Sequence, residues 1–372
     1  MAGAALRSLF ISGLLSSASA SLSTRSKENV AVYYGQGPNQ DRLTTFCSDD
    51  TIDIIILSFV YRFPEQANGY PGINFGNQCS NLVFTAPGYD GVDNPAADEL
   101  LLCPQLQEDL FTCRQSDKTI LLSLGGNSGG YQLTGTPDGT AFADLLWGMF
   151  GPLTDTWIAQ DGPRPFDFTD ASGAVHPFNV DGFDLDIEIP PVDGSNGYIA
   201  LVKQLRSLYS TDSTKPHYIT ASPQCIVPDA NLGVTLASSR FDMLFIQFYN
   251  TPQCAAITWA EANPSYQPGD DFNTAGFTFD SWVSWLATTQ SSEIPILITL
   301  PGSPSAAPGG GFLAADQARQ LASAYYCRPN FGGIAIWDAT WAQQSIESTL
   351  NFYQNAKQSL NMAAFETELS CV

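Results

Sequence analysis

The chain has 372 residues, and 44% of them are hydrophobic, which is enough for a large packed core and excludes a disordered protein. Its 37 acidic residues outnumber the 15 lysines and arginines, which gives a formal net charge of -22 at pH 7. A surface this negative repels phosphate backbones and anionic lipid headgroups, so we expect neither nucleic acid nor a membrane as a partner.

The N-terminal residues have the pattern of a secretory signal. Arg7 precedes a short apolar run that ends in small residues, Ala18-Ser19-Ala20. A positive start, an apolar centre and an A-x-A site are the features of a cleaved signal peptide, and the run is too short to span a bilayer. We therefore predict that residues 1–20 are a signal peptide and that the protein is secreted and extracellular.

Short apolar runs rich in β-branched residues recur along the rest of the chain. They predict eight strands, at Val30–Gly35, Ile52–Val60, Thr119–Leu124, Val180–Ile187, His217–Ala221, Phe241–Tyr249, Ile294–Leu300 and Gly333–Trp337. Helices are expected at Asp98–Phe111, Ala141–Phe150, Tyr198–Tyr209, Phe279–Thr288 and Asp316–Tyr326. Strands that are apolar on both faces and alternate with amphipathic helices are typical of parallel sheets buried on both sides.

The number of these units favours an α/β fold, a single (β/α)8 barrel of the TIM type, with a doubly wound open sheet as the alternative. Residues between Val60 and Asp98 are rich in Gly, Pro and Asn, and they predict a long loop. No Ser/Thr-rich or Pro-rich linker divides the sequence after Leu22, so we expect no separate binding module. Residues 21–372 are therefore predicted to form one domain.

The cysteines fit an exported protein. There are eight, Cys47, Cys79, Cys103, Cys113, Cys225, Cys254, Cys327 and Cys371. An even number favours disulfide bonds but leaves their pairing open. None lies in a Cys-x-x-Cys or Cys/His cluster, and His176 and His217 are the only histidines, so we expect no metal site and no cofactor.

The segment from Asp181 to Glu188, DGFDLDIE, is the most informative part of the sequence. Side chains alternate along a strand, so Asp184, Asp186 and Glu188 share one face, with successive Cα atoms about 6.6 Å apart. The apolar residues between them can pack on helices, which leaves the carboxyl groups facing the barrel axis. Carboxyl groups confined in this way cannot all stay ionised, so at least one should hold a proton near neutral pH. A solvated acidic turn or a calcium loop is the alternative, but the apolar alternation argues against it.

This segment matches the DxxDxDxE signature of glycoside hydrolase family 18, and Ser123-Leu124-Gly125-Gly126 matches the SxGG motif of that family. Further segments resemble the class III, hevamine-like chitinases of plants and fungi: Val32-Tyr33-Tyr34-Gly35-Gln36, Gln247-Phe248-Tyr249-Asn250 and Gly333-Ile334-Ala335-Ile336-Trp337. The resemblance extends from about Val30 to Trp337 and points to a secreted fungal chitinase.

The resemblance implies a chitinase that cleaves β-1,4 linkages of N-acetylglucosamine with retention, the substrate's own acetamido group acting as nucleophile. Glu188 would be the general acid and base, and Tyr249 would donate to the acetamido oxygen and hold it in line. Asp186 would hydrogen-bond the acetamido N–H and stabilise the developing positive charge, with Asp184 sharing its proton. Trp337 would form the floor of the sugar site, lined also by Tyr33, Gln247, Phe59 and Asn250, although core packing is the alternative for these residues. Asp181, Ser123, Gly125 and Gly126 would shape the strand ends.

The resemblance also implies the disulfide pairs Cys47–Cys113, Cys79–Cys103 and Cys225–Cys254, which leaves Cys327 and Cys371 to pair by elimination. The stretch from Leu300 to Gly333 has no room for the α+β domain that some family members insert there, so we expect an open groove and endo cleavage. The expected partners are chitin or chitin oligosaccharides, and the protein is expected to be a monomer.

Three alternatives remain. One is a catalytically weak chitin-binding lectin or inhibitor on the same barrel, although such relatives usually lose the acid that Glu188 preserves here. Another is an endo-β-N-acetylglucosaminidase that acts on N-glycans. The third is a non-enzymatic carbohydrate-binding or cell-wall protein.

Overall fold

A computed structural model describes residues 22–80, 82–84, 100–367 and 371. The predicted signal peptide, residues 1–20, lies outside the described residues, as do part of the predicted long loop and the first residues of the helix expected at Asp98–Phe111.

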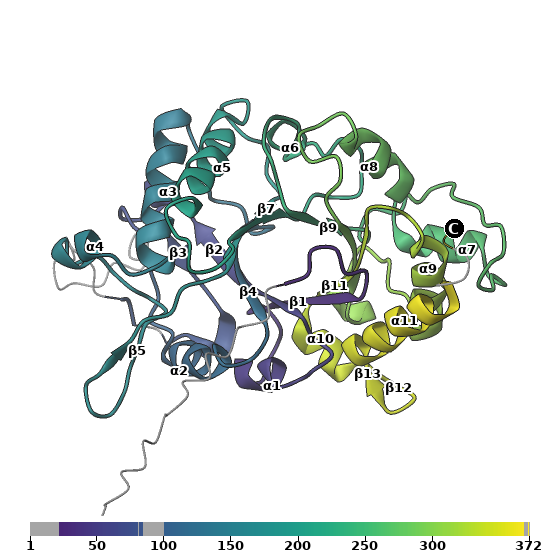
Figure 1. Cartoon of the computed structure of the whole chain (residues 1–372), viewed down its shortest axis with the longest axis horizontal. Coiled ribbons are helices and arrows are strands. Elements are labelled where there is room, and N and C mark those ends of the chain that lie inside the picture. Colours follow the sequence, from purple (N-terminus) through teal and green to yellow (C-terminus); the bar gives the residue numbers. More distant parts are fainter. Residues whose placement is uncertain (1–21, 81, 85–99, 368–370, 372) are drawn as a thin grey trace, which may run out of the picture.

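In the described part of the chain, eight parallel strands close into a barrel (Figure 1). They are β1 (Asn29–Tyr34), β2 (Ile54–Arg62), β4 (Thr119–Gly126), β7 (Gly182–Ile187), β8 (Tyr218–Ala221), β9 (Met243–Gln247), β10 (Ile296–Pro301) and β11 (Phe331–Trp337). β1 pairs with both β11 and β2, which closes the ring and rules out the open sheet. β3 (Gly72–Ile73) pairs antiparallel with the end of β2. The predicted (β/α)8 barrel is confirmed, and the strand ends differ from the prediction by about two residues.

Helices cover the outside of the barrel. The longer ones are α2 (Pro104–Cys113), α3 (Thr136–Phe150), α5 (Asn196–Tyr209), α8 (Phe279–Leu286), α9 (Ala315–Tyr325) and α11 (Phe352–Thr367). The shorter ones are α1 (Leu43–Cys47), α4 (Asp155–Ala159), α6 (Gly233–Ser238), α7 (Ala256–Ala262) and α10 (Ala339–Gln344). Two small hairpins, β5 (Phe168–Thr169) with β6 (Val175–His176) and β12 (Ile346–Glu347) with β13 (Leu350–Asn351), project from this layer. In Figure 1, α3 and α5 lie together on one side of the barrel, and α9 and α11 lie together on the other.

Each of the five predicted helices is present with shifted ends, whereas α11 was not predicted. Between β10 and β11 the chain forms a 3-10 turn (Pro304–Ala306) and α9. The structure therefore has no α+β insertion between these two strands, as the sequence predicts.

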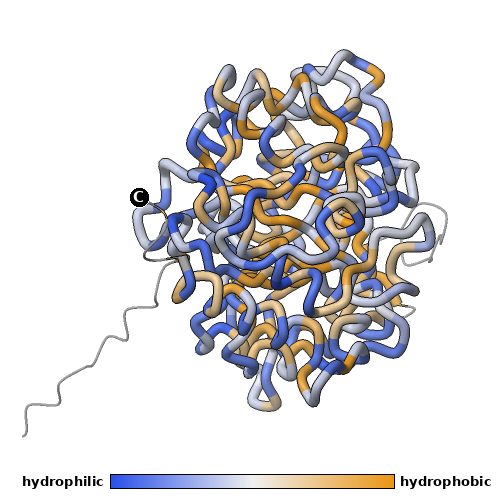
Figure 2. The backbone as a smooth tube through the Cα atoms, turned by 90° about the vertical axis from the view of Figure 1, so that its right-hand side faces the viewer, coloured by the Kyte–Doolittle hydropathy of each residue, from blue (hydrophilic) through white to orange (hydrophobic). Residues whose placement is uncertain are grey.

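Buried side chains form two layers, and Figure 2 shows the apolar segments concentrated through the middle of the molecule. The larger layer fills the space between strands and helices. The smaller layer lies inside the barrel and consists of Ala31, Tyr33, Ile54, Ile56, Leu121, Met243, Phe245, Leu297 and Ala335. Leu22 packs on this inner layer, and its carbonyl oxygen accepts a hydrogen bond from the hydroxyl of Tyr218, at the first residue of β8.

Three aspartates fasten neighbouring strands together at their N-terminal ends. Each aspartate directly precedes a strand, and its carboxylate accepts the backbone N–H of the second residue of the preceding barrel strand. The pairs are Asp53 with Val30, Asp181 with Ile120 and Asp242 with Ile219, with N···O distances of 2.7, 2.7 and 2.8 Å. Each aspartate donates its own N–H back to the carbonyl oxygen of the same residue. We call these reciprocal pairs the aspartate clasps.

A cation completes each clasp. Lys357, Lys215 and Arg206 form ion pairs with Asp53, Asp181 and Asp242, respectively. The side chain of Asp181, for which we predicted a structural role, therefore joins β7 to β4 at the end of the barrel where these strands begin.

Four disulfide bonds join Cys47 to Cys113, Cys79 to Cys103, Cys225 to Cys254 and Cys327 to Cys371, and every cysteine is paired as the sequence analysis expected. The Cys225–Cys254 bond ties the connection after β8 to the connection after β9.

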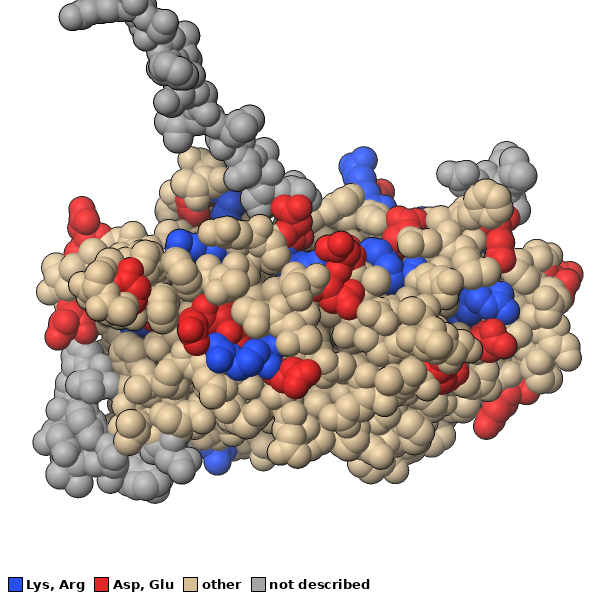
Figure 3. Space-filling model, turned by 90° about the horizontal axis from the view of Figure 1, so that it is seen from below, with Lys and Arg blue, Asp and Glu red and all other residues tan. Residues whose placement is uncertain are grey.

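Among the residues that the structure describes, no helix is both long and apolar enough to cross a membrane. On the face in Figure 3, acidic and basic side chains are interspersed, and the described residues show no continuous basic area there.

Replacement of Asp181 by alanine should destabilise the protein. The change leaves the N–H of Ile120 without its acceptor and Lys215 without its carboxylate partner. We expect the free energy of unfolding to fall by about 1–3 kcal/mol, measured by urea denaturation. Asp271→Ala, at an exposed loop position, is the control and should change it by less than about 0.5 kcal/mol. Equal stability of the two variants would contradict a structural role of the clasp.

Candidate active site

A cavity of about 330 Å³ opens at the C-terminal ends of the barrel strands. Its lining comprises Gln36, Phe59, Tyr61, Asn74, Asn127, Ser128, Asp186, Glu188, Gln247, Tyr249, Asn250, Ala306, Pro308 and Trp337. The predicted residues Phe59, Asp186, Glu188, Gln247, Tyr249, Asn250 and Trp337 are thus brought together. This is the end of a β/α barrel at which the connecting loops build binding sites.

The alternation along β7 directs its three acids inward, and the deepest of them is Asp184. Strand register places Ser123 of β4 and Thr220 of β8 directly beside it. Four hydroxyl oxygens lie within hydrogen-bond distance of its fully buried carboxyl group, those of Ser123 at 2.8 Å, Thr220 at 2.7 Å, Ser222 at 2.9 Å and Tyr33 at 3.2 Å. Burial raises the pKa of Asp184, and the hydroxyl bonds offset only part of that effect.

Tyr33 occupies a different place from the one predicted. We expected it to line the sugar site, but it is not part of the cavity lining. Its hydroxyl group points to Asp184 and also forms a short hydrogen bond with Ser222, and its ring lies against Trp337, with ring centroids 5.6 Å apart. The reason is its inward position on β1, one layer below the mouth of the barrel, among the inner apolar residues.

Asp186 lies one step nearer the mouth and is 3% exposed. The side-chain amide of Gln247 donates a hydrogen bond to its carboxyl group at 3.0 Å and a second one to the carbonyl oxygen of Ser222. Burial is the main reason why the pKa of Asp186 lies well above its usual value, and the negative charges of Glu188, Asp184 and Asp229 add to it. The bond from Gln247 opposes this shift only in part.

Glu188 directly follows β7 and is partly exposed to the cavity. Its backbone N–H donates to the hydroxyl of Tyr131 at 2.9 Å, and that hydroxyl donates to the carbonyl oxygen of Gly126 at 2.8 Å. Burial raises the pKa of Glu188, hydrogen bonds from Gln247 and Gln224 lower it, and the charge of Asp229 raises it. The net effect is a raised pKa, which favours the protonated form of this carboxyl group.

Tyr249 lines the cavity opposite the acids and is 7% exposed. Burial, followed by the negative charges of Asp186, Glu188 and Asp338, raises its pKa well above the usual value. The phenol therefore stays neutral and can donate a hydrogen bond to a ligand. Among the described residues that line the cavity, there is no lysine, arginine or histidine.

An aromatic surface forms another part of the lining. The rings of Trp337 and Phe59 stack with centroids 5.8 Å apart and an interplanar angle of 27°. Both residues line the cavity, so they present a flat apolar surface close to the carboxyl groups. Such a surface beside convergent polar groups is suited to a ligand with one apolar face and several hydroxyl groups.

The glycines of the SxGG segment are required by their surroundings. Gly125 and Gly126 have φ values of 113° and 87°, which side chains rarely adopt. A Cβ atom at Gly125 would collide with the carbonyl oxygen of Asp186, and one at Gly126 would lie 3.0 Å from the ring of Phe59. These positions therefore allow β4 to end close to both the acids and the aromatic surface.

Asn250 contributes to the cavity and also holds a neighbouring loop. Its side-chain oxygen accepts the N–H of Gly309 at 2.9 Å, and its own N–H donates to the carbonyl oxygen of Gly310. The loop that it fixes supplies Ala306 and Pro308 to the lining.

Several lining residues were missed in the sequence analysis, namely Gln36, Tyr61, Asn74, Asn127, Ser128, Ala306 and Pro308. Tyr61 lies near the end of β2, and Asn127 and Ser128 directly follow β4. The rule that barrel sites form at the C-terminal strand ends would have found them. In the described residues, no group of three or more His, Cys, Asp or Glu side chains is arranged to hold a metal ion.

Comparisons with known proteins give a consistent assignment. Residues 29–303 match the model of glycosyl hydrolases family 18. The chain is 39% identical over 366 residues to a probable endochitinase of Arthroderma benhamiae, an alignment that covers 94% of this chain and 45% of the relative. The chain therefore spans less than half the length of that relative.

Two solved structures are similar over most of the chain. A chitinase of Ipomoea carnea, ICChI, is 26% identical, with a TM-score of 0.63, covering 89% of this chain and 99% of its own. A xylanase and alpha-amylase inhibitor protein of Scadoxus multiflorus, XAIP-II, is 24% identical, with a TM-score of 0.64, covering 90% and 98%. The second similarity concerns the fold alone.

The buried acids predict how stability depends on pH. A carboxyl group whose pKa is raised by folding supports the folded state fully below its unfolded pKa, and this support is lost as the pH rises through the folded pKa. Glu188→Gln removes the cost of burying the charge. We expect the variant to melt at a higher temperature than the wild type at about pH 8 and to show little difference below about pH 4, where both states are protonated.

The matched control is Glu261→Gln, at an exposed position on α7. Scanning calorimetry across the pH range should show no pH-dependent difference between this variant and the wild type. If Glu188→Gln behaved like this control, the carboxyl group of Glu188 would not be raised in pKa by folding.

Proposed function

The chain belongs to glycosyl hydrolase family 18, and from this premise we propose that it is an endochitinase, a glycosidase that hydrolyses the β-1,4 linkages of chitin. The observation that carries the proposal is the row of Asp184, Asp186 and Glu188, which rises through the barrel into a cavity with an aromatic floor. The family and the endochitinase name of the relative support the same substrate.

The proposed reaction retains the anomeric configuration and uses the substrate as nucleophile, as the exceptions to the two-carboxylate rule do. The carbonyl oxygen of the 2-acetamido group attacks the anomeric carbon while the bond to the leaving oxygen breaks. Glu188 gives its proton to that oxygen, and an oxazolinium ion forms. Water then attacks the anomeric carbon, Glu188 takes a proton from it, and the acetamido group is released intact.

The other residues have roles that follow from their positions. Asp186 would accept the acetamido N–H and stabilise the positive charge of the intermediate, because it lies next to Glu188 on the same strand face. Asp184, surrounded by four hydroxyl groups, would share the proton of Asp186. Tyr249, held neutral, would donate to the acetamido oxygen and keep it in line for attack.

The sugar at the cleavage point would stack on Trp337, whose ring packs against the rings of Phe59 and Tyr33. Gln247 would orient Asp186, and Asn250 would contribute through the loop that it fixes. Metal ions and cofactors have no part in the proposed steps.

Secretion is also part of the proposal. Four disulfide bonds favour an oxidising, extracellular location, which agrees with the signal peptide predicted at residues 1–20. The protein is proposed to act as a monomer on chitin chains or chitin oligosaccharides.

The central test is the replacement of the proposed acid. Glu188→Gln should lower the turnover of a chromogenic chitotriose substrate by about 10²–10⁴-fold, because glutamine cannot deliver a proton. Binding of chitin oligosaccharides, measured by calorimetry, should persist because the aromatic floor is unchanged. Glu261→Gln serves as the control and should retain full activity. Equal, negligible rates in wild type and variant would favour a lectin or an inhibitor, and cleavage of N-glycans alone would favour an endo-β-N-acetylglucosaminidase.

The groove predicts the pattern of products. Only the 3-10 turn at Pro304–Ala306 and α9 separate β10 from β11, so no added domain walls the cavity on that side. We expect cleavage of internal linkages, with a mixture of oligomers early in the digestion of a long soluble substrate. Mass spectrometry of early time points checks this, and release of dimer alone from one end would contradict it.

A further inference from the structure

Glu188 lies just beyond the end of the strand ladder that holds the other two acids. The last paired residues of β7 and β4 are Ile187 and Gly126, and β8 has already ended beside Leu185. In the described part of the chain, the ladder therefore provides no partner for the backbone of Glu188. Backbone N–H groups that are shielded from water need an acceptor, so this position depends on a group from outside the ladder.

A single phenol is that group. The hydroxyl oxygen of Tyr131 accepts the N–H of Glu188 at 2.9 Å, and the same hydroxyl donates to the carbonyl oxygen of Gly126 at 2.8 Å. The carbonyl oxygen of Asp186 lies 3.4 Å away. Burial raises the pKa of Tyr131, so its hydroxyl keeps its proton and can donate and accept at the same time. The hydroxyl thereby joins the end of β7 to the end of β4.

Tyr131 is itself held firmly. It is fully buried, and its ring lies against Phe63 with centroids 5.0 Å apart. The backbone N–H of the next residue, Gln132, donates to the side-chain oxygen of Gln66 at 2.9 Å. A Cβ atom at Gly125 would lie 3.1 Å from Cζ of Tyr131, so the first glycine of the SxGG segment also leaves room for the phenol. Such a rigid support is what precise placement of a reacting group requires.

The bond to Gly126 has a second effect, because it closes the loop that follows β4. Residues 127–130 lie between the two bonded residues, and Asn127 and Ser128 of this loop line the cavity. Tyr131 is not among the lining residues. Its hydroxyl therefore fixes both a catalytic candidate and part of the cavity wall from a position behind them.

We propose that Tyr131 is a positioning residue for Glu188, its hydroxyl group fixing the backbone of Glu188 relative to the end of β4. The inference rests on the proposed role of Glu188 as the proton donor. Because Tyr131 does not line the cavity, it acts through Glu188 and not on the ligand. A misplacement of about 1 Å can cost about 100-fold in rate, so the loss of this bond should be visible in turnover.

The test compares two Tyr→Phe variants that differ in what the hydroxyl contacts. Tyr131→Phe keeps the ring and removes the acceptor of Glu188. Tyr198→Phe is the matched control: Tyr198 is also fully buried and its ring faces Phe63, but its hydroxyl has no hydrogen-bond partner among the described residues. Tyr131→Phe should lower kcat on the chromogenic chitotriose substrate by about 10- to 100-fold with little change in KM. Tyr198→Phe should leave both constants unchanged.

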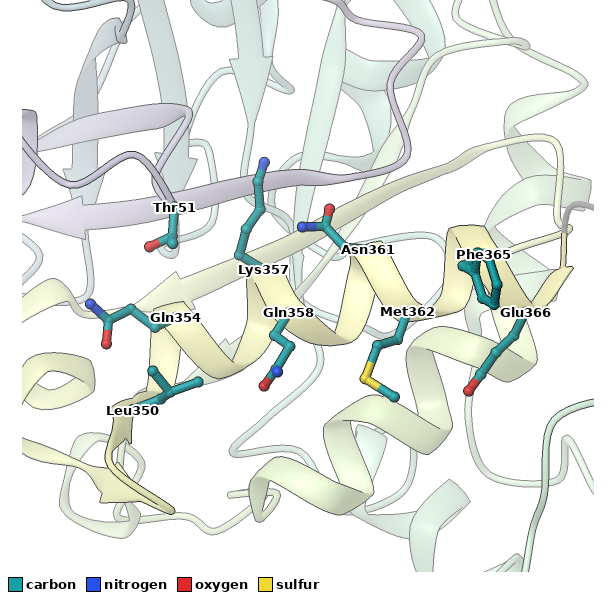
Figure 4. A pocket seen from close by; sticks show the side chains of 9 residues that line it. All are labelled: Thr51, Leu350, Gln354, Lys357, Gln358, Asn361, Met362, Phe365 and Glu366. Atoms are coloured by element: carbon teal, nitrogen blue, oxygen red, sulfur yellow. The ribbon is translucent and has the colours of Figure 1, made fainter.

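A second control separates positioning from stability. Lys357 extends from α11 beside a groove of about 530 Å³, and its ammonium group donates to Asp53 and to the carbonyl oxygen of Glu28 (Figure 4). Lys357→Met breaks an aspartate clasp at the end of the barrel opposite the cavity. It should lower the urea midpoint of unfolding and leave kcat unchanged. A loss of kcat equal to that of Tyr131→Phe would show that lost stability explains the effect, and it would overturn the proposal.

Another measurement needs no substrate. In ¹⁵N-labelled protein, the amide signal of Glu188 is assigned by comparison with Glu188→Gln. Hydrogen exchange at this amide should be about 10-fold faster in Tyr131→Phe, because the lost hydrogen bond makes local opening easier. In Tyr198→Phe it should match the wild type.

The proposal is overturned if the Glu188 amide of Tyr131→Phe exchanges at the wild-type rate, or if the two Tyr→Phe variants have equal kcat values. A wild-type protein that binds but does not hydrolyse chitin would refute the proposed function. In that case the exchange rates would still decide whether the hydroxyl of Tyr131 holds the backbone of Glu188.

Discussion

The site depends on one constraint, the alternation of side chains along β7 inside a closed barrel. Because the ring is complete, every second residue of β7 must face the interior, and the side chains of Asp184 and Asp186 are buried there. A buried carboxyl group is costly unless it is hydrogen-bonded or protonated. The three carboxyl groups are stabilised in different ways. Four hydroxyl groups surround Asp184, the amide of Gln247 donates to Asp186, and Glu188 is partly exposed.

The choice of neutral donors has a chemical consequence. An arginine or lysine beside these acids would stabilise them more, but it would also lower their pKa values and remove the proton. Hydroxyl and amide groups stabilise the carboxylates less than a cation would, so the pKa values of all three acids stay raised. In the proposed reaction, the same arrangement would leave negative charge available to the cationic intermediate. The lack of cations in the described lining is thus consistent with the proposed chemistry.

Much of this arrangement follows from local patterns. The strands are recognisable because they are apolar on both faces, and the acids of β7 are recognisable because they break that pattern at every second position. Residues that act through tertiary contacts are not recognisable in this way. Tyr131 and Asp229 resemble any loop tyrosine and aspartate until the fold places them against Glu188 and Gln224. Helix α11 was missed because nothing in its polar sequence shows that it will cover β1 and α9.

The aspartate clasps bear on how the barrel is assembled. They join β1 to β2, β4 to β7 and β8 to β9, so their backbone bonds bind the strands two by two. Six of the eight barrel strands thus form three pairs, while the loops that build the groove emerge from the other rim. A polypeptide cut between two of these pairs, in the connection from β7 to β8, would keep each reciprocal bond within a single fragment. The architecture is therefore suited to fragment complementation and circular permutation. The loops of the groove can change in sequence without affecting the bonds that close the barrel, because they lie at the other rim.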